Sequence, residues 1–287
     1  MALVEPPVRL LLTGAIDYAG LFPPAGLDIE HAAKEYARYL DTDHAWMLGS
    51  FVAPAARLEE LERLIPQRQQ PWKVNALVGP GISEELTAIE RFNRSGAGKV
   101  TWIEAKVSSA GQIRSVRGLA PLRFGLYFEV AEIALLDAVQ AGASRAKIRT
   151  GGVTPDAFPA ADILAPLIRA AFERRVPFKC TAGLHHALRG EYALTYQPYS
   201  PRATMHGFLN VLLAALFAQT AVSTEELIEI LNARSPAVFG LQADGITWRH
   251  YRMTNQQIAQ AREHGLVSFG SCSFTEPITE LQSLGFL

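Results

Sequence analysis

Two lysines are the most conspicuous candidates for chemistry, because each lies in a short apolar segment that runs into a turn of small residues. Lys147 belongs to the segment Arg145–Gly152, and Lys179 belongs to Pro177–His186. Partial desolvation and nearby cations favour the neutral amine of a lysine, which attacks the carbon of a carbonyl group. The two segments therefore indicate covalent chemistry on a small oxygenated carbonyl compound.

If these segments are β-strands, each carries two polar residues on one face, and two earlier segments do the same. The side-chain period of two places residues on common faces in pairs: Glu104 with Lys106, Tyr127 with Glu129, Lys147 with Arg149, and Lys179 with Thr181. Parallel strands covered by helices are normally apolar throughout, so four polar faces near strand ends need an explanation. A β/α barrel assembles its active site at the C-terminal ends of its strands. We therefore expect one pocket there, containing Glu104, Glu129, Lys147 and Lys179.

Segments of strand type alternate with amphipathic segments of helix type along the chain. The predicted strands are residues 10–13, 46–52, 72–78, 100–107, 123–129, 145–149, a seventh that carries Lys179, and either 246–251 or 266–273 as the eighth. This alternation predicts an α/β fold, a (β/α)8 barrel of the TIM type, rather than an open sheet. We expect a single domain over residues 1–287, with long loops after strand 1 (14–26) and after strand 7 (beyond Gly183).

Composition limits the classes of function. The chain has 287 residues, 49% of them hydrophobic, and a formal net charge of -1, so its overall charge favours neither nucleic acid nor an anionic membrane as a partner. The longest apolar run, residues 207–222, is interrupted by Asn210 and Gln219 and is too short for a bilayer span. Two cysteines without metal-site spacing are typical of a reducing cytosol. We expect a cytoplasmic protein with a small-molecule substrate; the sequence leaves open whether it forms a homo-oligomer.

The lysine segments resemble those of class I aldolases of the deoxyribose-phosphate aldolase type, in which adjacent barrel strands each deliver a lysine followed by a small-residue turn. The matching pieces are Lys147 with Thr150–Gly152, Lys179 with Thr181–Gly183, and Phe269–Ser271 as a phosphate-facing turn. The resemblance implies that Lys147 forms the Schiff base, that Lys179 is the cation lowering its pKa, and that turn amides form an anion cradle. The pair His185-His186 and the long loop after it depart from the family pattern.

These patterns predict a set of site residues and predict that the reaction needs no cofactor. The candidate catalytic residues are Lys147, Lys179, Glu104 and Glu129, with His185 and His186 as general acid or base. The candidate substrate-binding residues are Lys106, Arg149, Thr150, Gly151, Gly152, Thr181, Gly183, Asp17 and Tyr18.

Three alternatives compete with this hypothesis. The first is a metal-dependent lyase, isomerase or hydrolase, in which His185, His186 and His206 hold a divalent metal ion with Glu104, Glu129 or Asp17. The second is that the charged residues form a structural ion network only, since buried charges pair for solvation reasons alone. The third is a barrel without catalytic activity that binds a small molecule or serves as a scaffold.

Overall fold

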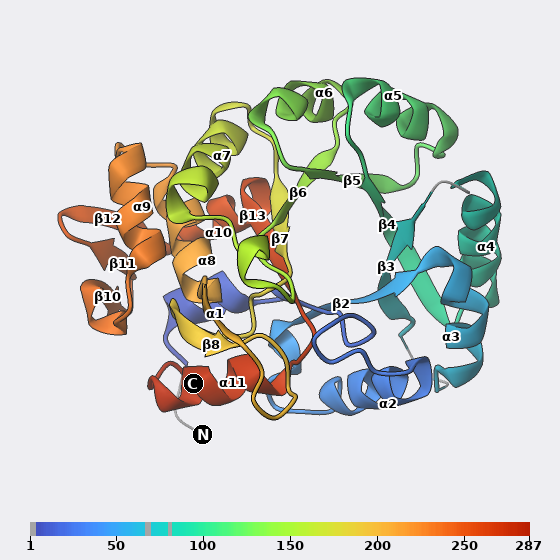
Figure 1. The fold of residues 1–287 in the computed structure, drawn as a ribbon, viewed down its shortest axis with the longest axis horizontal. Helices are drawn as coiled ribbons and strands as arrows, with labels where there is room; N and C mark the ends of the chain where they lie inside the picture. Colours follow the sequence, from blue (N-terminus) through green and yellow to red (C-terminus); the bar gives the residue numbers. More distant parts are fainter. Residues whose placement is uncertain (1–3, 67–69, 80–81) are drawn as a thin grey trace.

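The computed structural model describes residues 4–66, 70–79 and 82–287. In these ranges eight parallel strands close into a barrel, in the order β1-β13-β7-β6-β5-β4-β3-β2 (Figure 1). The barrel strands are β1 (Ile16–Tyr18), β2 (Leu48–Pro54), β3 (Trp72–Val78), β4 (Gly98–Lys106), β5 (Gly125–Val130), β6 (Arg145–Arg149), β7 (Phe178–Thr181) and β13 (Leu266–Ser271). The predicted α/β barrel of the TIM type is confirmed.

Helices surround the strands on the outside of the barrel (Figure 1). They are α1 (Pro6–Leu12), α2 (Ile29–Tyr39), α3 (Leu58–Leu64), α4 (Ile82–Ser95), α5 (Ala110–Leu119), α6 (Leu136–Ala141), α7 (Ala161–Glu173), α8 (Phe208–Phe217), α9 (Thr224–Asn232), α10 (Asn255–His264) and α11 (Thr275–Ser283). Short 3-10 turns occupy Ala45–Met47, Ala55–Arg57, Ile133–Leu135, Pro155–Ala157 and Pro236–Val238. Capping boxes are present at the N-termini of α9 and α10.

The prediction of a first strand at residues 10–13 was wrong, because this segment is the end of helix α1. Proline in the first turn has the backbone φ angle that a helix needs, and the buried residues Val8, Leu11 and Leu12 then repeat with helical spacing. The true first strand, β1, lies inside the stretch predicted to be a loop. It has only three residues, which is too few for an alternating pattern to be visible in the sequence.

Of the two candidates for the eighth strand, residues 266–273 contain the correct one, because β13 closes the barrel between β1 and β7. The other candidate contains β11 (Gly245–Trp248), which pairs antiparallel with β10 (Phe239–Gln242) and β12 (Tyr251–Thr254) in a separate sheet. Two-residue connections join these three strands, and such connections permit only antiparallel pairing. This sheet lies beside the barrel, next to α8 and α9 (Figure 1).

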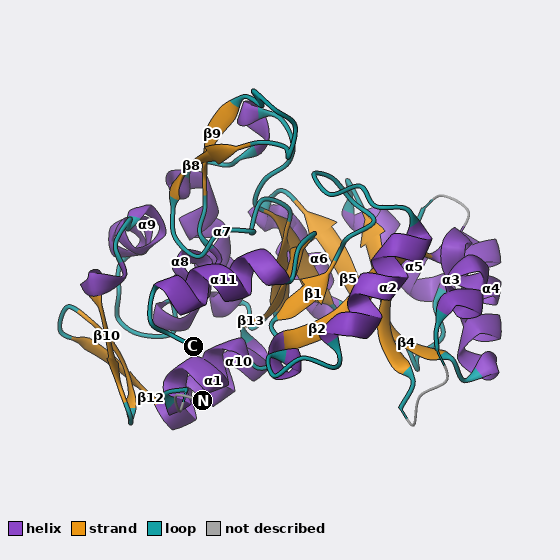
Figure 2. Cartoon of the chain, turned by 90° about the horizontal axis from the view of Figure 1, so that it is seen from below, coloured by secondary structure: helices purple, strands orange, loops and turns teal. Residues whose placement is uncertain are grey.

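The segment after β7, predicted to be a loop, contains a hairpin of β8 (Gly190–Ala193) and β9 (Arg202–Met205). The hairpin projects from the rest of the chain in Figure 2. Three residues of its strands, Tyr192, Ala203 and Met205, form a small apolar cluster with Leu194 and Phe158.

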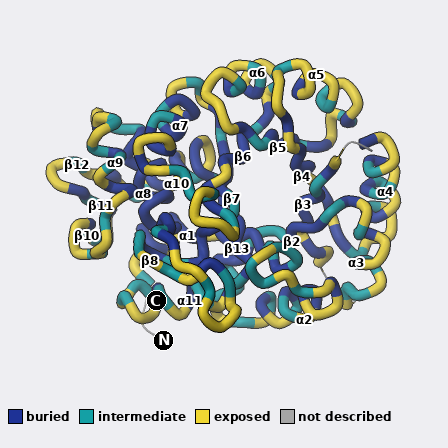
Figure 3. The backbone as a smooth tube through the Cα atoms, viewed as in Figure 1, coloured by how far each residue is buried: buried dark blue, intermediate teal, exposed yellow. Residues whose placement is uncertain are grey.

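One large hydrophobic core joins the barrel strands to the inner faces of the surrounding helices. Figure 3 shows that the barrel strands are mostly buried and that the surrounding helices are exposed on their outward faces. Helix α8 is the exception, because all ten of its residues are buried. Within the described ranges, none of the helices combines the length and apolar character of a membrane span.

Candidate active site

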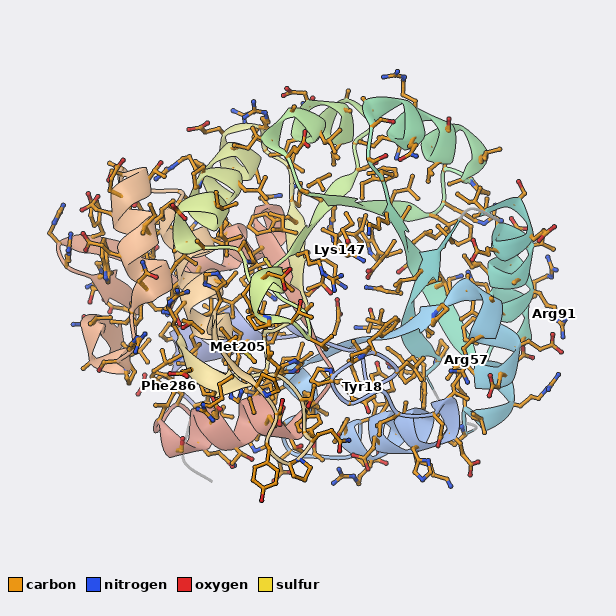
Figure 4. All side chains as sticks on the ribbon, viewed as in Figure 1. Tyr18, Arg57, Arg91, Lys147, Met205 and Phe286 are labelled. Carbon is orange, nitrogen blue, oxygen red and sulfur yellow. The ribbon has the colours of Figure 1, made fainter. Side chains whose placement is uncertain are left out.

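A pocket of about 270 Å³ lies at the C-terminal ends of the barrel strands. Its polar lining includes four charged residues that the sequence predicted to converge: Glu104, Glu129, Lys147 and Lys179. The strand register explains the convergence, because Lys147 on β6 is paired with Glu129 on β5 and with Lys179 on β7. The side chain of Lys147 points into the space enclosed by the strands (Figure 4).

The charged side chains form a continuous chain of ion pairs from the barrel interior toward its mouth. Lys179 Nζ lies 2.5 Å from Asp17 Oδ2 and 2.7 Å from Glu104 Oε1. Lys147 Nζ lies 3.3 Å from Glu104 Oε2 and 2.9 Å from Glu129 Oε2. The two lysines therefore share one carboxylate, with one ammonium group on each of its oxygens.

Lys179 and Glu104 hold each other in their charged forms. Burial alone opposes the charge on Lys179, but the carboxylates of Asp17 and Glu104 outweigh it and raise the pKa of this lysine. Burial alone would also raise the pKa of Glu104, but Lys179 and Lys147 together lower it to about 2. Lys179 is therefore a permanently protonated group at neutral pH, and Glu104 a permanent carboxylate.

Asp17, predicted as a substrate-binding residue and, in the metal-dependent alternative, as a metal ligand, lies at the inner end of this ion cluster. It accepts hydrogen bonds from the backbone amide of Ser50 at 2.9 Å and from Ser268 Oγ at 2.8 Å. Asn75 was not predicted as a site residue, yet its Nδ2 lies 3.2 Å from Glu104 Oε1 and 3.5 Å from Asp17 Oδ2. A lone amide within the otherwise apolar interior of β3 is the same signal that revealed the lysines, and it could have identified Asn75.

Arg149 and Lys106 lie on the predicted faces of their strands but differ in their relation to the pocket. Arg149 lines the pocket at its rim, where its side chain is 55% exposed and its Nη1 lies 3.9 Å from Glu129 Oε1. Lys106 is exposed and instead lines a neighbouring depression with Glu129 and Arg149. The structure therefore does not bring Lys106 into the pocket.

The small-residue turns after the two lysines are joined to each other. Thr150 Oγ1 donates hydrogen bonds to the carbonyl oxygens of Thr181 and Ala182, so its hydroxyl connects the two turns. A Cβ atom added to Gly151 would lie 2.9 Å from the Cα of Gly183, and 2.5 Å from the ring of Phe158. Glycine is therefore required at position 151 for close packing between the turns, which is a structural reason independent of anion binding.

The remaining turn residues are divided between the pocket and the strand. Gly152, Thr181 and Gly183 line the pocket. Residues 269–271, predicted to be a phosphate-facing turn, are the last part of strand β13. Phe269 stacks on Phe208 of helix α8, with ring centroids 4.9 Å apart.

Tyr18, a candidate substrate-binding residue, does not line the pocket. Strand alternation turns Asp17 into the barrel and Tyr18 outward, where its ring packs against Tyr36 and Tyr39 of helix α2 and Phe51 of β2. In Figure 4, Tyr18 lies between the barrel strands and α2. Tyr18 thus belongs to the core between strands and helix.

His185 is the one member of the histidine group that lines the pocket within the described chain. Its Nδ1 lies 3.2 Å from Ser271 Oγ and 3.6 Å from Cys272 Sγ. Burial, and secondarily the neighbouring His186, lower the pKa of His185 to about 4. His185 is therefore a neutral hydrogen-bonding group at neutral pH.

His186 and His206 are engaged elsewhere. His186 stacks on Tyr192, with ring centroids 3.5 Å apart, and its Nδ1 lies 2.5 Å from Glu280 on helix α11. His206 Nε2 donates to the carbonyl oxygen of Pro159 at 2.7 Å, and Arg189 approaches its Nδ1 at 3.2 Å. These contacts hold the hairpin region in place. In the part of the chain that the structure describes, no three potential ligand residues are grouped as a metal site requires, so the predicted histidine constellation is not assembled.

No protein-family model matches this sequence, and no curated protein matches it either.

Acid should destabilise the fold through its buried neutral histidines. Burial lowers the pKa of His206, like that of His185, to about 4, below its ordinary value near 6.5. The unfolded chain therefore binds more protons between these values, so stability is full above pH 6.5 and is lost as the pH falls toward 4. Each histidine should cost roughly 2 kcal/mol between pH 7 and pH 5. Denaturant unfolding at both pH values measures this loss.

The variant His206→Gln should reduce the loss between pH 7 and pH 5, because glutamine does not titrate. His264→Gln is the matched control, since the side chain of His264 is 72% exposed. An equal loss in wild type and His206→Gln would contradict this explanation.

Proposed function

We propose that this chain is an enzyme that forms a Schiff base between Lys147 and a small carbonyl compound and then makes or breaks a carbon–carbon bond. The observation that carries the proposal is the position of Lys147 on the wall of the barrel-mouth pocket, with its amine between Glu104 and Glu129. The C-terminal mouth is where barrel enzymes place their reacting groups.

Glu129 is the proposed proton acceptor for the first step. Lys147 must lose a proton before its nitrogen attacks the carbonyl carbon. The closest carboxylate oxygen, on Glu129, lies 2.9 Å from Nζ, and its side chain is 13% exposed. The resulting carbinolamine loses its hydroxyl as water, taking the proton back from Glu129, and an iminium ion remains. When the bond between the α and β carbons of the substrate breaks, its electron pair moves into the iminium to give an enamine. The hydroxyl on the β carbon then loses its proton to the Glu129 carboxylate, and the β carbon leaves as the carbonyl carbon of the second product.

Lys179 is proposed as a positioning residue rather than a nucleophile. Its side chain is 1% exposed, and both Asp17 and Glu104 hold its ammonium group. Burial alone would lower the pKa of Lys179, but these two carboxylates outweigh it and raise the pKa, so the neutral amine is too scarce to react. Its role is to keep Glu104 ionised and fixed beside Lys147, which refines the role that the resemblance to aldolases implies.

The cavity favours this proposal over a purely structural ion network. A structural network must recover the desolvation cost of its buried charges through close ion pairs and hydrogen bonds, and an open cavity beside the charges contributes nothing to that. Here Lys147, Glu129 and Arg149 border an open volume of about 270 Å³. Its opposite wall consists of apolar residues, which exclude water from a reacting group: Ala19, Phe22, Pro23, Val52 and Leu77.

Borohydride trapping tests the proposal. The protein is incubated with a panel of small aldehydes, ketones and oxo acids, each with sodium borohydride, which reduces an iminium ion to a stable amine. We expect the intact mass to increase by the mass of one carbonyl compound less one oxygen atom, which leaves as water. The matched control is the same protein unfolded in denaturant, in which the lysines react without selectivity. No adduct from any member of the panel on folded protein would reject Schiff-base chemistry and favour a binding or scaffold role.

A further inference from the structure

We infer that Arg149 recognises a carboxylate group of the substrate, so that the site accepts a short oxo acid. The inference rests on the proposed Schiff base at Lys147 and adds the class of substrate. The cations of the pocket differ in their partners: Lys179 and Lys147 are each held between two carboxylates, whereas Arg149 is not.

Arg149 has unused capacity for hydrogen bonding. Its guanidinium group carries five N–H donors in a planar fork that matches a carboxylate. Its one ion pair among the described residues, to Glu129 at 3.9 Å, is too long for a hydrogen bond. The side chain is 55% exposed, whereas that of Lys147 is 7% exposed. A ligand can therefore bind the guanidinium without first breaking a strong internal contact.

The position of Arg149 suits a group attached to the reacting carbonyl. It follows Lys147 by two residues on β6, so both side chains leave the same face, about 7 Å apart along the strand. Its Nη2 lies 3.8 Å from the place of a Cβ on Gly152, which locates the guanidinium over the turn at the pocket rim. A molecule whose carbonyl carbon reaches Lys147 would present a nearby carboxylate to Arg149.

The charge balance of the cluster disfavours a doubly negative ligand at this point. Three carboxylates, on Asp17, Glu104 and Glu129, oppose the two lysine ammonium groups. The charge of Arg149 brings the sum over these six residues to zero, and Glu129 lies beside it. One guanidinium next to a carboxylate suits a monoanion better than a phosphate dianion.

Matched probes test the inference. Pyruvate and its neutral ester methyl pyruvate present the same ketone with and without the carboxylate, and the rate of borohydride trapping is measured for each. Arg149→Gln should slow the trapping of pyruvate about 10- to 100-fold, the value of a charge-assisted hydrogen bond, and leave methyl pyruvate within about twofold of wild type. Arg149→Lys should be intermediate, because lysine keeps the charge without the fork. Arg114→Gln, at an exposed position of helix α5, should change neither rate.

The outcomes separate this inference from the proposed function. Equal effects of Arg149→Gln on pyruvate and methyl pyruvate, or no effect on either, would overturn the carboxylate assignment while Schiff-base chemistry stands. Trapping of dihydroxyacetone phosphate that depends on Arg149 more strongly than trapping of pyruvate would identify phosphate instead and also overturn it. If wild type traps nothing, binding of propionate, which has no ketone, is measured by ligand-observed NMR. Binding lost in Arg149→Gln would then support the inference, and binding unchanged or absent would overturn it.

Discussion

Lys147→Met is expected to abolish borohydride trapping and to lower carbon–carbon lyase activity by at least about 10³-fold, as removal of a covalent nucleophile does. Methionine fills a similar volume but has no amine, so neither the attack nor the iminium ion is possible. Trapping is measured by intact mass, and activity by carbonyl release or condensation with the compound that traps fastest. Glu104 keeps its ion pair with Lys179 in this variant, so the barrel should remain folded.

Lys147→Arg separates the nucleophile from the charge. Arginine keeps a cation between Glu104 and Glu129, but its guanidinium is protonated at all accessible pH values and does not form a Schiff base. The variant should therefore be as inactive as Lys147→Met while unfolding at a denaturant concentration closer to that of wild type. Activity retained in Lys147→Arg would indicate that the position supplies only charge.

Lys179→Met should destabilise the fold by about 3–5 kcal/mol, the usual cost of removing one partner from a buried ion pair. The change leaves Asp17 and Glu104 buried without the ammonium group that both contact. Denaturant unfolding measures the effect. Lys73→Met is the matched control, because Lys73 is an exposed lysine of barrel strand β3, and its replacement should cost no more than about 0.5 kcal/mol.

A second substitution shows whether the cost arises from uncompensated charge. Asp17→Asn in the Lys179→Met background removes one of the two carboxylates that have lost their contact with Lys179, and it should recover part of the lost stability. A Lys179→Met variant as stable as Lys73→Met would refute the described ion cluster, and a double variant less stable than the single one would refute its electrostatic origin.

The sequence located most candidate residues on regular strands well, with the exception of Lys106, which is exposed at the end of β4 and outside the pocket. The period of two placed Glu104, Glu129, Lys147 and Lys179 on inward faces, and the register of neighbouring strands then brought them into contact. The pattern is strong there because a charge in an otherwise apolar strand is conspicuous. Asn75 shows that the same argument reaches further than the charged residues to which it was applied.

Errors arose where the chain has no period to read. The three residues of β1 lie between glycines, so Ile16–Tyr18 resembled part of a loop. Asp17 and Tyr18 were both predicted to bind the substrate, although their side chains face opposite ways. The histidines lie outside the strands, where neighbours in sequence diverge: His185 contacts Ser271, whereas His186 contacts Glu280. Contacts of this kind depend on tertiary packing and have no signature in the sequence.

The position of the reduced adduct tests the central claim most directly. Wild-type protein is trapped with its best carbonyl compound under borohydride and digested, and the modified peptide is sequenced by tandem mass spectrometry. We predict that the added mass lies on Lys147, the amine that borders the pocket, and that Lys179 is unmodified because its amine stays protonated between Asp17 and Glu104. An adduct on Lys179, or on surface lysines in proportion to their exposure, would contradict the account.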